Sequence, residues 1–273
     1  MRVLLTGAAG EIGRDLRAGL AGRYELLRLT DLAPLAPAGA GEETIHADLA
    51  DAGAVAKAVK GMDAILHLGG VSRESDWTRL LSANVAGTVN IFEEARRAGL
   101  RRVIYASSNH VIGYHRAQRR VTASEPVRPD TRYGVTKAFG EALGRYMADK
   151  HGMEVVCLRI GSYRQQVTAT RELATWLSPG DMLRLAVAAL EAPDVHFEVV
   201  YGVSANTRRS WGADGAQRIG YEPRDDAEAY AGTARDIRPS DVPAANDGFA
   251  LDDLFHGGFY AALDCVSDPR RID

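Results

Sequence analysis

The chain lacks the features that mark several classes of protein. Its 273 residues include only two cysteines, Cys157 and Cys265, which lie far apart. A disulfide framework or a cysteine metal site needs more thiols, so we expect reduced thiols and no metal. No apolar run approaches the roughly 18 residues of a membrane span. The apolar N-terminus is interrupted by glycines and an acid, unlike a signal peptide, so we expect a cytoplasmic protein without a membrane partner.

Clustered positive charge is absent too. The formal net charge is −3, and no block of five or more Lys and Arg occurs. Nucleic-acid binding depends on such clusters, so nucleic acid is not an expected partner. What the chain does have is a hydrophobic content of 46%. That is enough to bury a large core in one domain, or in one domain with a small lobe.

The chain begins with a pattern typical of a nucleotide cradle. Residues 2–6 predict a buried strand and residues 10–21 predict a helix, with Gly7, Gly10 and Gly13 at the turn between them. Gly7 permits the tight turn, Gly10 lets a pyrophosphate approach the backbone, and Gly13 lets the helix pack against the strand. The spacing is G-x-x-G-x-x-G, which is weak evidence alone and needs support from a second cofactor-binding residue.

That support comes at Asp31, which lies just after a second predicted strand over residues 24–30. In a dinucleotide fold an acid at this place bonds the adenosine ribose hydroxyls. Its carboxylate repels the 2′-phosphate of NADP, so Asp31 favours NAD. Arg28 lies close enough in the sequence to keep NADP open, and the alternative interpretation of Asp31 is a solvated turn.

The remaining pattern alternates strands and helices. Further strands are expected at residues 44–47, 63–68, 102–107, 154–160 and 197–201, and further helices after Asp51, at 76–98, after Tyr133, and at 179–191, 214–219 and 225–234. This order predicts an α/β fold with a doubly wound parallel sheet. We expect a dinucleotide-binding domain at 1–162, packed as one unit with a small substrate lobe and C-terminal tail at 163–273.

Candidate site residues come directly after the predicted strands, because the carboxyl ends of parallel strands form the ligand-binding edge. Asp48 is either an adenine contact or a helix cap. The segment 69–71 allows backbone to lie against a ribose or nicotinamide, and Ser72 presents a hydroxyl beyond it. His67 lies within its strand, which favours a core role. Asn84 is either a buried structural hydrogen bonder or part of the active-site floor.

The catalytic candidates are Ser108, at the end of a strand, and Tyr133 and Lys137, at i and i+4 of a helix. On one helix face the ammonium lies beside the phenol, which lowers the Tyr pKa toward that of a general base. Ser108 then bonds the reacting oxygen. Y-x-x-x-K alone is common on solvated helices, but its place in a dinucleotide fold favours catalysis.

These motifs resemble the extended short-chain dehydrogenase/reductase family, the NAD-dependent epimerases and dehydratases, over about the first 160 residues. The matching segments are T-G-A-A-G-E-I-G, H-L-G-G, N-V-A-G-T-V-N, A-S-S-N-H and Y-G-V-T-K. Within the family, G-G-V-S, S-S-N-H-V-I-G-Y, R-I-G-S and A-T-W-L-S are similar to the members that act on free uronic acids. The resemblance implies NAD-dependent oxidation of galacturonate or glucuronate at C1 to an aldaro-lactone, which opens to the aldaric acid.

The resemblance also implies roles for individual residues. Tyr133, Lys137 and Ser108 would be catalytic. NAD would be held by Gly7, Gly10, Glu11, Ile12, Gly13, Asp31, Asp48, Leu49, Leu68, Gly69, Gly70, Val71, Lys137 and Ser162. The sugar acid would be held by Ser72, Ser108, Asn109, His110, Tyr133 and Arg171.

Some of these roles have alternatives in the sequence. A guanidinium is the natural bidentate partner of a carboxylate, so Arg171, and after it Arg164, is a candidate clamp; the alternative is a surface salt bridge. His110 is either a partner of a sugar hydroxyl or a core or capping histidine. Tyr163 departs from the family pattern, in which we expect a small residue, and could reshape the substrate rim.

Two other functions stay open. A sugar-nucleotide epimerase or dehydratase would keep Tyr133 and Lys137 but retain its cofactor, and a non-catalytic dinucleotide sensor would need no base. The part of the chain beyond residue 162 is small, which favours a small sugar acid over a nucleotide sugar. The apolar patch at 257–263 either covers the sheet or joins a neighbouring subunit, and we expect a homo-oligomer.

Overall fold

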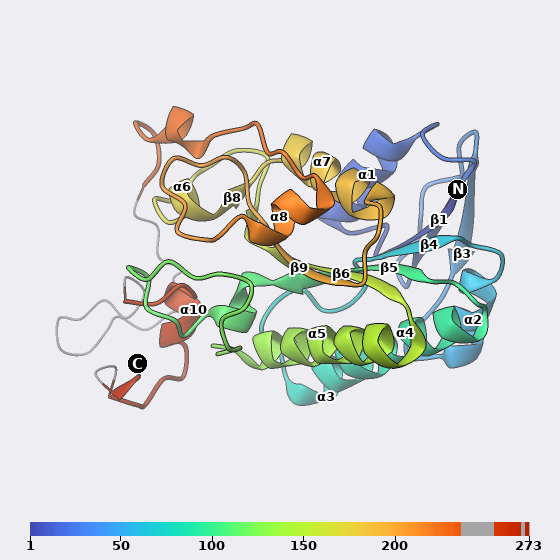
Figure 1. Cartoon of the computed structure of the whole chain (residues 1–273), viewed down its shortest axis with the longest axis horizontal. Coiled ribbons are helices and arrows are strands. Elements are labelled where there is room, and N and C mark those ends of the chain that lie inside the picture. Colours follow the sequence, from blue (N-terminus) through green and yellow to red (C-terminus); the bar gives the residue numbers. More distant parts are fainter. Residues whose placement is uncertain (236–253, 269–270, 273) are drawn as a thin grey trace.

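The fold is built on a parallel sheet of seven strands between two layers of helices (Figure 1). This computed structural model describes residues 1–235, 254–268 and 271–272. The strand order is β3-β2-β1-β4-β5-β6-β9, with every neighbouring pair parallel. The strands are β1 Arg2–Thr6, β2 Leu26–Asp31, β3 Glu42–His46, β4 Ala64–His67, β5 Arg102–Ser108, β6 Glu154–Ile160 and β9 Phe197–Gly202. The predicted doubly wound α/β fold is therefore confirmed.

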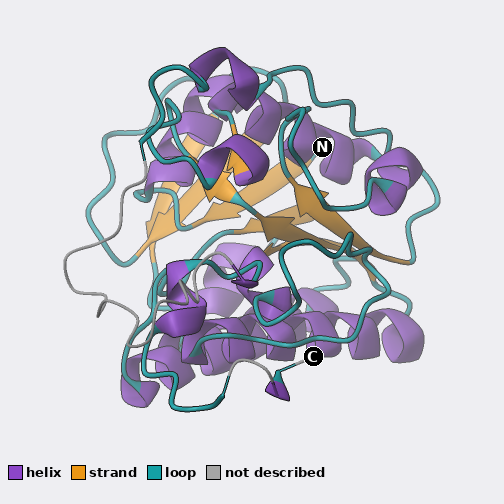
Figure 2. Cartoon of the chain, turned by 90° about the vertical axis from the view of Figure 1, so that its left-hand side faces the viewer, coloured by secondary structure: helices purple, strands orange, loops and turns teal. Residues whose placement is uncertain are grey.

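Helices cover both faces of the sheet (Figure 2). In chain order the helical segments are α1 Glu11–Leu20, α2 Ala52–Val59, α3 Trp77–Leu80, η1 Leu81–Ala86, α4 Gly87–Arg97, η2 Asn109–Ile112, α5 Arg132–His151, α6 Glu172–Thr175, α7 Pro179–Glu191, α8 Asp214–Ile219, η3 Ala227–Tyr230 and α10 Phe259–Ala262. None of the described helices is long and apolar enough to cross a membrane.

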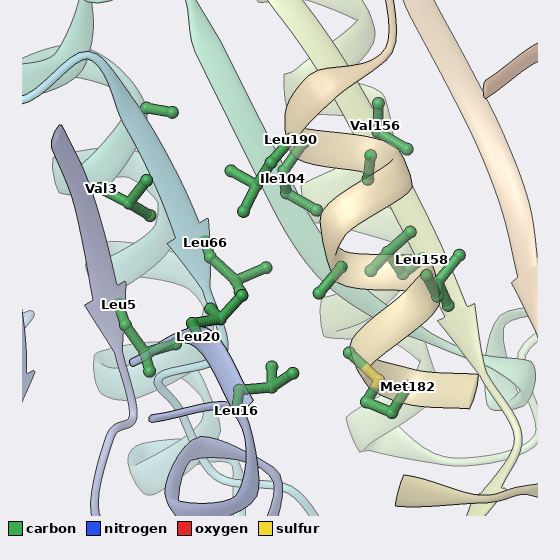
Figure 3. Packing of buried hydrophobic residues seen from close by; sticks show 14 of the residues in the cluster. Val3, Leu5, Leu16, Leu20, Leu66, Ile104, Val156, Leu158, Met182 and Leu190 are labelled. Atoms are coloured by element: carbon green, nitrogen blue, oxygen red, sulfur yellow. The ribbon is translucent and has the colours of Figure 1, made fainter. Parts of the chain in front are cut away.

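The central strands β1, β4, β5 and β6 are mostly apolar because both faces of the sheet are covered there. Alternate residues of each strand point to opposite sides, so Val3 and Leu5 of β1 face α1 and α7, whereas Leu4 faces α2 and α4. Figure 3 shows the first of these two layers, where Leu16 of α1 and Met182 of α7 pack against the strands. Two continuous cores therefore hold the strand ends in fixed positions.

The predicted helix over 76–98 is divided into three parts by a π-helical turn, η1. Asn84 lies in this turn and is buried. Its amide exchanges two hydrogen bonds with the backbone of Val71, of 2.7 and 3.0 Å, and donates to the Thr136 hydroxyl at 3.1 Å. Asn84 is thus a structural hydrogen bonder that joins the segment after β4 to α5. A π turn often marks a functional position in a helix.

Other differences from the expected elements are small. The strand predicted from residue 24 begins at Leu26, and the helix predicted over 225–234 is the short 3-10 helix η3. A two-stranded sheet of β7 Ser162–Tyr163 and β8 Trp176–Leu177 was not expected, since two-residue strands carry no periodicity. Of the tail that begins at residue 236, residues 236–253 lie outside the described part.

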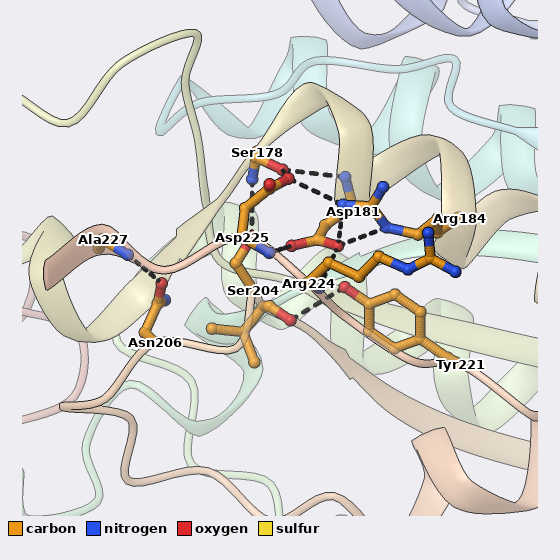
Figure 4. A network of polar contacts seen from close by, with 10 residues as sticks. Ser178, Asp181, Arg184, Ser204, Asn206, Tyr221, Arg224, Asp225 and Ala227 are labelled. Carbon is orange, nitrogen blue, oxygen red and sulfur yellow. Dashed lines mark hydrogen bonds and ion pairs between the residues drawn. The ribbon is translucent and has the colours of Figure 1, made fainter. Parts of the chain in front are cut away.

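The segment after α8 is fixed to the N-terminus of α7 by a buried carboxylate (Figure 4). The Asp181 side chain is 0% exposed. It accepts hydrogen bonds from the backbone N–H of Arg224 at 2.8 Å and of Asp225 at 3.0 Å, and from Nε of Arg184 at 2.7 Å. Ser178 caps the same helix by accepting from the Asp181 N–H. One acid therefore satisfies the backbone of a loop that has no secondary structure of its own.

We expect Asp181→Ala to lower the free energy of unfolding by about 2–4 kcal/mol, because the N–H groups of Arg224 and Asp225 lose their buried acceptor. Urea unfolding should show a lower midpoint with an unchanged slope. Glu222→Ala, an exposed acid of the same loop, is the control and should leave the midpoint in place. Equal midpoints for the two variants would contradict this role of Asp181.

Candidate active site

A cavity of about 1280 Å³ lies along the carboxyl ends of the strands. It extends from the glycine loop after β1 to α10 near the end of the chain. All of the residues that the sequence predicted for cofactor, substrate and catalysis line this cavity. The structure therefore brings the whole predicted set together, and the geometry indicates what each part can hold.

The glycine loop is shaped for close approach of backbone and ligand. Gly7 has φ +71°, and a Cβ there would lie 2.8 Å from the backbone N of Gly69. A Cβ on Gly13 would lie 2.1 Å from the carbonyl oxygen of Gly7. Gly10 is the N-cap residue of α1 and carries no side chain, so the first-turn N–H groups stay open to an anion. The residues present thus fit a dinucleotide pyrophosphate.

Asp31 is held at the end of β2 beside this loop. Its carboxylate accepts from the backbone N–H groups of Ala9 and Ala33, each at 2.9 Å. Arg28 is buried elsewhere: it donates to the carbonyls of Ala58 and Lys60 and pairs with Glu43. Arg28 is therefore committed to other partners and does not supply a cation for a 2′-phosphate at Asp31.

The residue Asp48 lines the cavity, whereas the neighbouring Asp51 caps α2. Asp48 accepts from the backbone N–H of Ala50 at 2.9 Å, a local turn. His67 lies in the core, hydrogen bonded to the Thr6 hydroxyl at 2.8 Å, and burial lowers its pKa to about 3. It is a neutral structural histidine, as its place within the strand predicts.

Tyr133 and Lys137 lie at the start of α5, against the end of β5. Glu74, from the loop after β4, accepts the Tyr133 N–H at 2.9 Å and so fixes the first turn of the helix. The Lys137 ammonium donates to the Ala106 carbonyl at 2.8 Å and lies 5.6 Å from the centroid of the Tyr133 ring. Phenol, ammonium and the Ser108 hydroxyl thus share one wall of the cavity.

Burial controls the ionisation of both groups. It raises the pKa of Tyr133 to about 12, while the Ser108 hydrogen bond acts in the opposite direction. Burial lowers the pKa of Lys137 to about 8. The sequence led us to expect a lowered Tyr pKa, but in this structure the loss of water around the phenolate outweighs the Ser108 hydrogen bond and raises the pKa.

Arg171 lines the cavity and lies just before α6. Its Nη2 donates to the His256 carbonyl at 2.8 Å and, with the Asn109 amide oriented to satisfy both of its groups, to the Asn109 oxygen at 3.1 Å. Burial lowers the pKa of Arg171, while the charges of Asp130 and Glu172 raise it. Arg164, the second candidate clamp, is 52% exposed and lies 3.3 Å from Glu172.

Comparison with known proteins agrees with this geometry. Residues 3–163 match the sequence profile of the NAD dependent epimerase/dehydratase family. The chain belongs to this family. It is 44% identical to a uronate dehydrogenase of Pseudomonas syringae pv. tomato, over 96% of this chain and 93% of the relative. A uronate dehydrogenase of Pseudomonas putida is 42% identical over 95% of each chain.

Solved structures give the same relationship. A mutant of uronate dehydrogenase from Agrobacterium tumefaciens, complexed with NAD, superposes with a TM-score of 0.87 and 42% identity. The match covers 95% of this chain and 96% of that chain. A glucuronic acid dehydrogenase from Chromohalobacter salexigens superposes with a TM-score of 0.87 and 39% identity, covering 99% and 98%. The likeness to these two structures therefore extends over nearly the whole chain.

Tyr163, where the resemblance led us to expect a small residue, has a structural partner. The Tyr163 hydroxyl donates to the carboxylate of Asp15 on α1, and Gln165 donates to the same oxygen at 2.7 Å. Burial and Asp15 raise the pKa of Tyr163. The side chain therefore joins β7 to α1 beside the glycine loop, so its effect falls on the cofactor end of the cavity.

The sequence missed several residues that line the cavity. Three of them, Phe259, Tyr260 and Leu263, belong to the apolar patch at 257–263. From the sequence we expected this patch either to cover the sheet or to join a neighbouring subunit. Tyr260 packs edge-on against His110, with ring centroids 4.7 Å apart. Glu74 was missed too. The composition of the patch signalled burial, but no local pattern indicates which distant surface it covers.

We expect this epimerase/dehydratase family member to bind NADH at least about tenfold more tightly than NADPH, a difference of ~1.4 kcal/mol, because the fixed Asp31 carboxylate repels the 2′-phosphate. Fluorescence titration with both cofactors measures the ratio. Asp31→Asn should bring it closer to one, and the control Asp48→Asn, at the same sheet edge, should leave it unchanged. Equal affinities in the wild type would refute the assignment of Asp31.

Proposed function

We propose that this chain is an NAD-dependent dehydrogenase that oxidises a free hexuronic acid, galacturonate or glucuronate, at C1. The product is the aldaro-lactone, which water opens to the aldaric acid. The observation that carries the proposal is the position of the buried Arg171 guanidinium, in the same cavity as Tyr133, Lys137 and Ser108. A base beside a hydroxyl and a cation beside a carboxylate are what a uronic acid requires. The names of the relatives support the same substrate class.

In this proposal the phenolate oxygen of Tyr133 accepts the proton of the C1 hydroxyl. Ser108 donates a hydrogen bond to the substrate oxygen and stabilises the charge that develops there. The glycine loop and Asp31 would hold NAD⁺, which would supply the acceptor for the hydride that leaves C1. The proton and the hydride together account for the two electrons and two hydrogens that leave the sugar.

Lys137 supports the base through its charge. Its ammonium is fixed on the Ala106 carbonyl beside the phenol. A phenolate at Tyr133 is stabilised by this charge in a site with little water, where Coulomb attraction is stronger than in bulk. The raised pKa of Tyr133 means that the phenolate depends on such positive charge.

Arg171 selects the substrate in this proposal. A guanidinium pairs with a carboxylate through two parallel hydrogen bonds. A neutral aldose has the same C1 hydroxyl but offers the Arg171 guanidinium no carboxylate to pair with. The part of the chain beyond residue 162 is short, which favours a free sugar acid. Association into a homo-oligomer, a cytoplasmic location and a domain boundary near residue 162 remain predictions from the sequence.

The chemistry is tested by NADH formation. Wild-type protein should reduce NAD⁺ with galacturonate or glucuronate, and Tyr133→Phe should lose about 10²–10⁴-fold in turnover because the base is gone. Tyr146→Phe, an exposed tyrosine on the same helix, is the matched control and should retain activity. NADH binding should be unchanged in both variants.

Two results would sink this mechanism. One is wild-type turnover by Tyr133→Phe. The other is conversion of UDP-glucose or dTDP-glucose without net NADH by the wild-type protein, which is the behaviour of an epimerase or dehydratase that retains its cofactor.

The carboxylate clamp makes a separate prediction. Arg171→Ala should lower kcat/KM for galacturonate by the equivalent of about 2–5 kcal/mol, because the substrate carboxylate loses a buried partner. Activity on galactose should change little, so the ratio of the two values collapses. Arg164→Ala is the control and should preserve the ratio. An equal fall for both sugars in Arg171→Ala would instead make Arg171 structural.

A further inference from the structure

A buried carboxylate contacts a histidine of the substrate pocket. Nδ1 of His110 lies 2.9 Å from Oδ1 and 3.0 Å from Oδ2 of Asp130. Asp130 precedes α5, and its side chain is 0% exposed. His110 belongs to η2, directly after β5, and 13% of its side chain is exposed. The imidazole thus lies between a dry carboxylate and the cavity.

Two glycines from separate segments enclose the carboxylate. A Cβ on Gly113 would lie 2.1 Å from the carboxyl carbon of Asp130, and a Cβ on Gly257 would lie 1.7 Å from its Oδ2. The Gly257 N–H donates to the Gly113 carbonyl at 2.9 Å, which holds the C-terminal segment over the acid. Thr131 supplies one longer hydroxyl contact of 3.3 Å. Within the described part of the chain, the imidazole is therefore the main side-chain donor to this acid.

The other ring nitrogen of His110 is available to a ligand. His110 lines the cavity, with its ring edge-on to Tyr133 at 6.1 Å and to Tyr260 at 4.7 Å between centroids. Among the described residues Nε2 has no hydrogen-bond partner. A neutral imidazole has one donor and one acceptor nitrogen, so the partner of Nδ1 decides what Nε2 offers.

We infer that Asp130 is a positioning residue that fixes His110 as the Nδ1–H tautomer, so that Nε2 accepts a hydrogen bond from one hydroxyl of the sugar acid. A carboxylate on one ring nitrogen orients the ring and sets the tautomer. The substrate part of this inference rests on the proposed function. The site thus has a second determinant of substrate specificity. Arg171 selects the carboxylate of the substrate, and the Asp130–His110 pair selects one of its hydroxyl groups.

The tautomer can be measured without any substrate. Long-range ¹⁵N–¹H correlation spectra of the full chain separate the two neutral tautomers, and His110→Gln identifies the His110 signals. The wild type should show Nδ1–H. In Asp130→Asn the neutral amide is a weaker acceptor and its nitrogen competes as a donor, so the Nε2–H signal should appear. An Nε2–H ring or an imidazolium in the wild type, or an unchanged tautomer in Asp130→Asn, would overturn the inference.

The selection of a hydroxyl is tested with substrates. The measurement is kcat/KM for the uronate and for each of its 2-, 3- and 4-deoxy analogues. In the wild type, removal of one of these hydroxyls should lower kcat/KM by about 10–100-fold, because Nε2 of His110 loses its hydrogen-bond donor. In Asp130→Asn and His110→Gln the cost at that position should fall to within about threefold, while the other two positions keep their wild-type cost. The control Asp264→Asn, an exposed acid nearby, should resemble the wild type.

A purely structural role gives a different pattern. It would lower kcat/KM for the uronate and all three analogues by the same factor, and this result would reject the positioning role. If the wild type oxidises no uronate at all, the proposed function fails, whereas the tautomer measurement still decides whether Asp130 controls His110.

Discussion

Parallel strand pairing is the constraint on which the site depends. Because every strand of the sheet runs the same way, the carboxyl ends of β1, β2, β4, β5 and β6 meet at one edge. The loops there must pass within van der Waals distance of one another. Gly7 and Gly69 come after neighbouring strands, and a side chain on Gly7 would collide with the backbone of Gly69. Glycine at this contact is therefore a requirement of the sheet as well as of the ligand.

The removal of water from this edge gives the site its electrostatic character. Burial acts on the charged form of each group, so it raises the pKa of Tyr133 and lowers those of Lys137 and Arg171. Loss of water thus raises the pKa of the phenol and lowers the pKa of the two cationic groups. A cavity with buried cations favours anionic ligands, because an anion restores the interaction that the cations lost with water.

The sequence predicts what is local. Each of these features lies within one turn or at the end of one strand: the glycine loop, Asp31, and the pair Tyr133 and Lys137. Periodicity and turn chemistry therefore suffice to place them. The contact between His110 and Asp130 joins η2 to the residues just before α5 across an irregular segment. Tyr260 reaches His110 only because the C-terminal segment docks on Gly113. Such long-range docking leaves no periodic pattern, and the sequence signals only the apolar composition of the patch.

A buried ion pair holds in place the cavity wall that carries Ser108, Tyr133 and Lys137. Arg159 of β6 binds both oxygens of Glu141 on α5, at 2.9 and 2.8 Å, and Ser107 of β5 donates to the same carboxylate at 2.6 Å. Such a pair adds little net stability, since desolvation of the two charges offsets their attraction. Its consequence is geometric. Ser107 directly precedes Ser108 on β5, and Glu141 lies one helical turn after Lys137 on α5. The ion pair therefore joins β5, α5 and β6 close to the site, so these elements cannot shift independently and the hydroxyl, the phenol and the ammonium keep their relative positions.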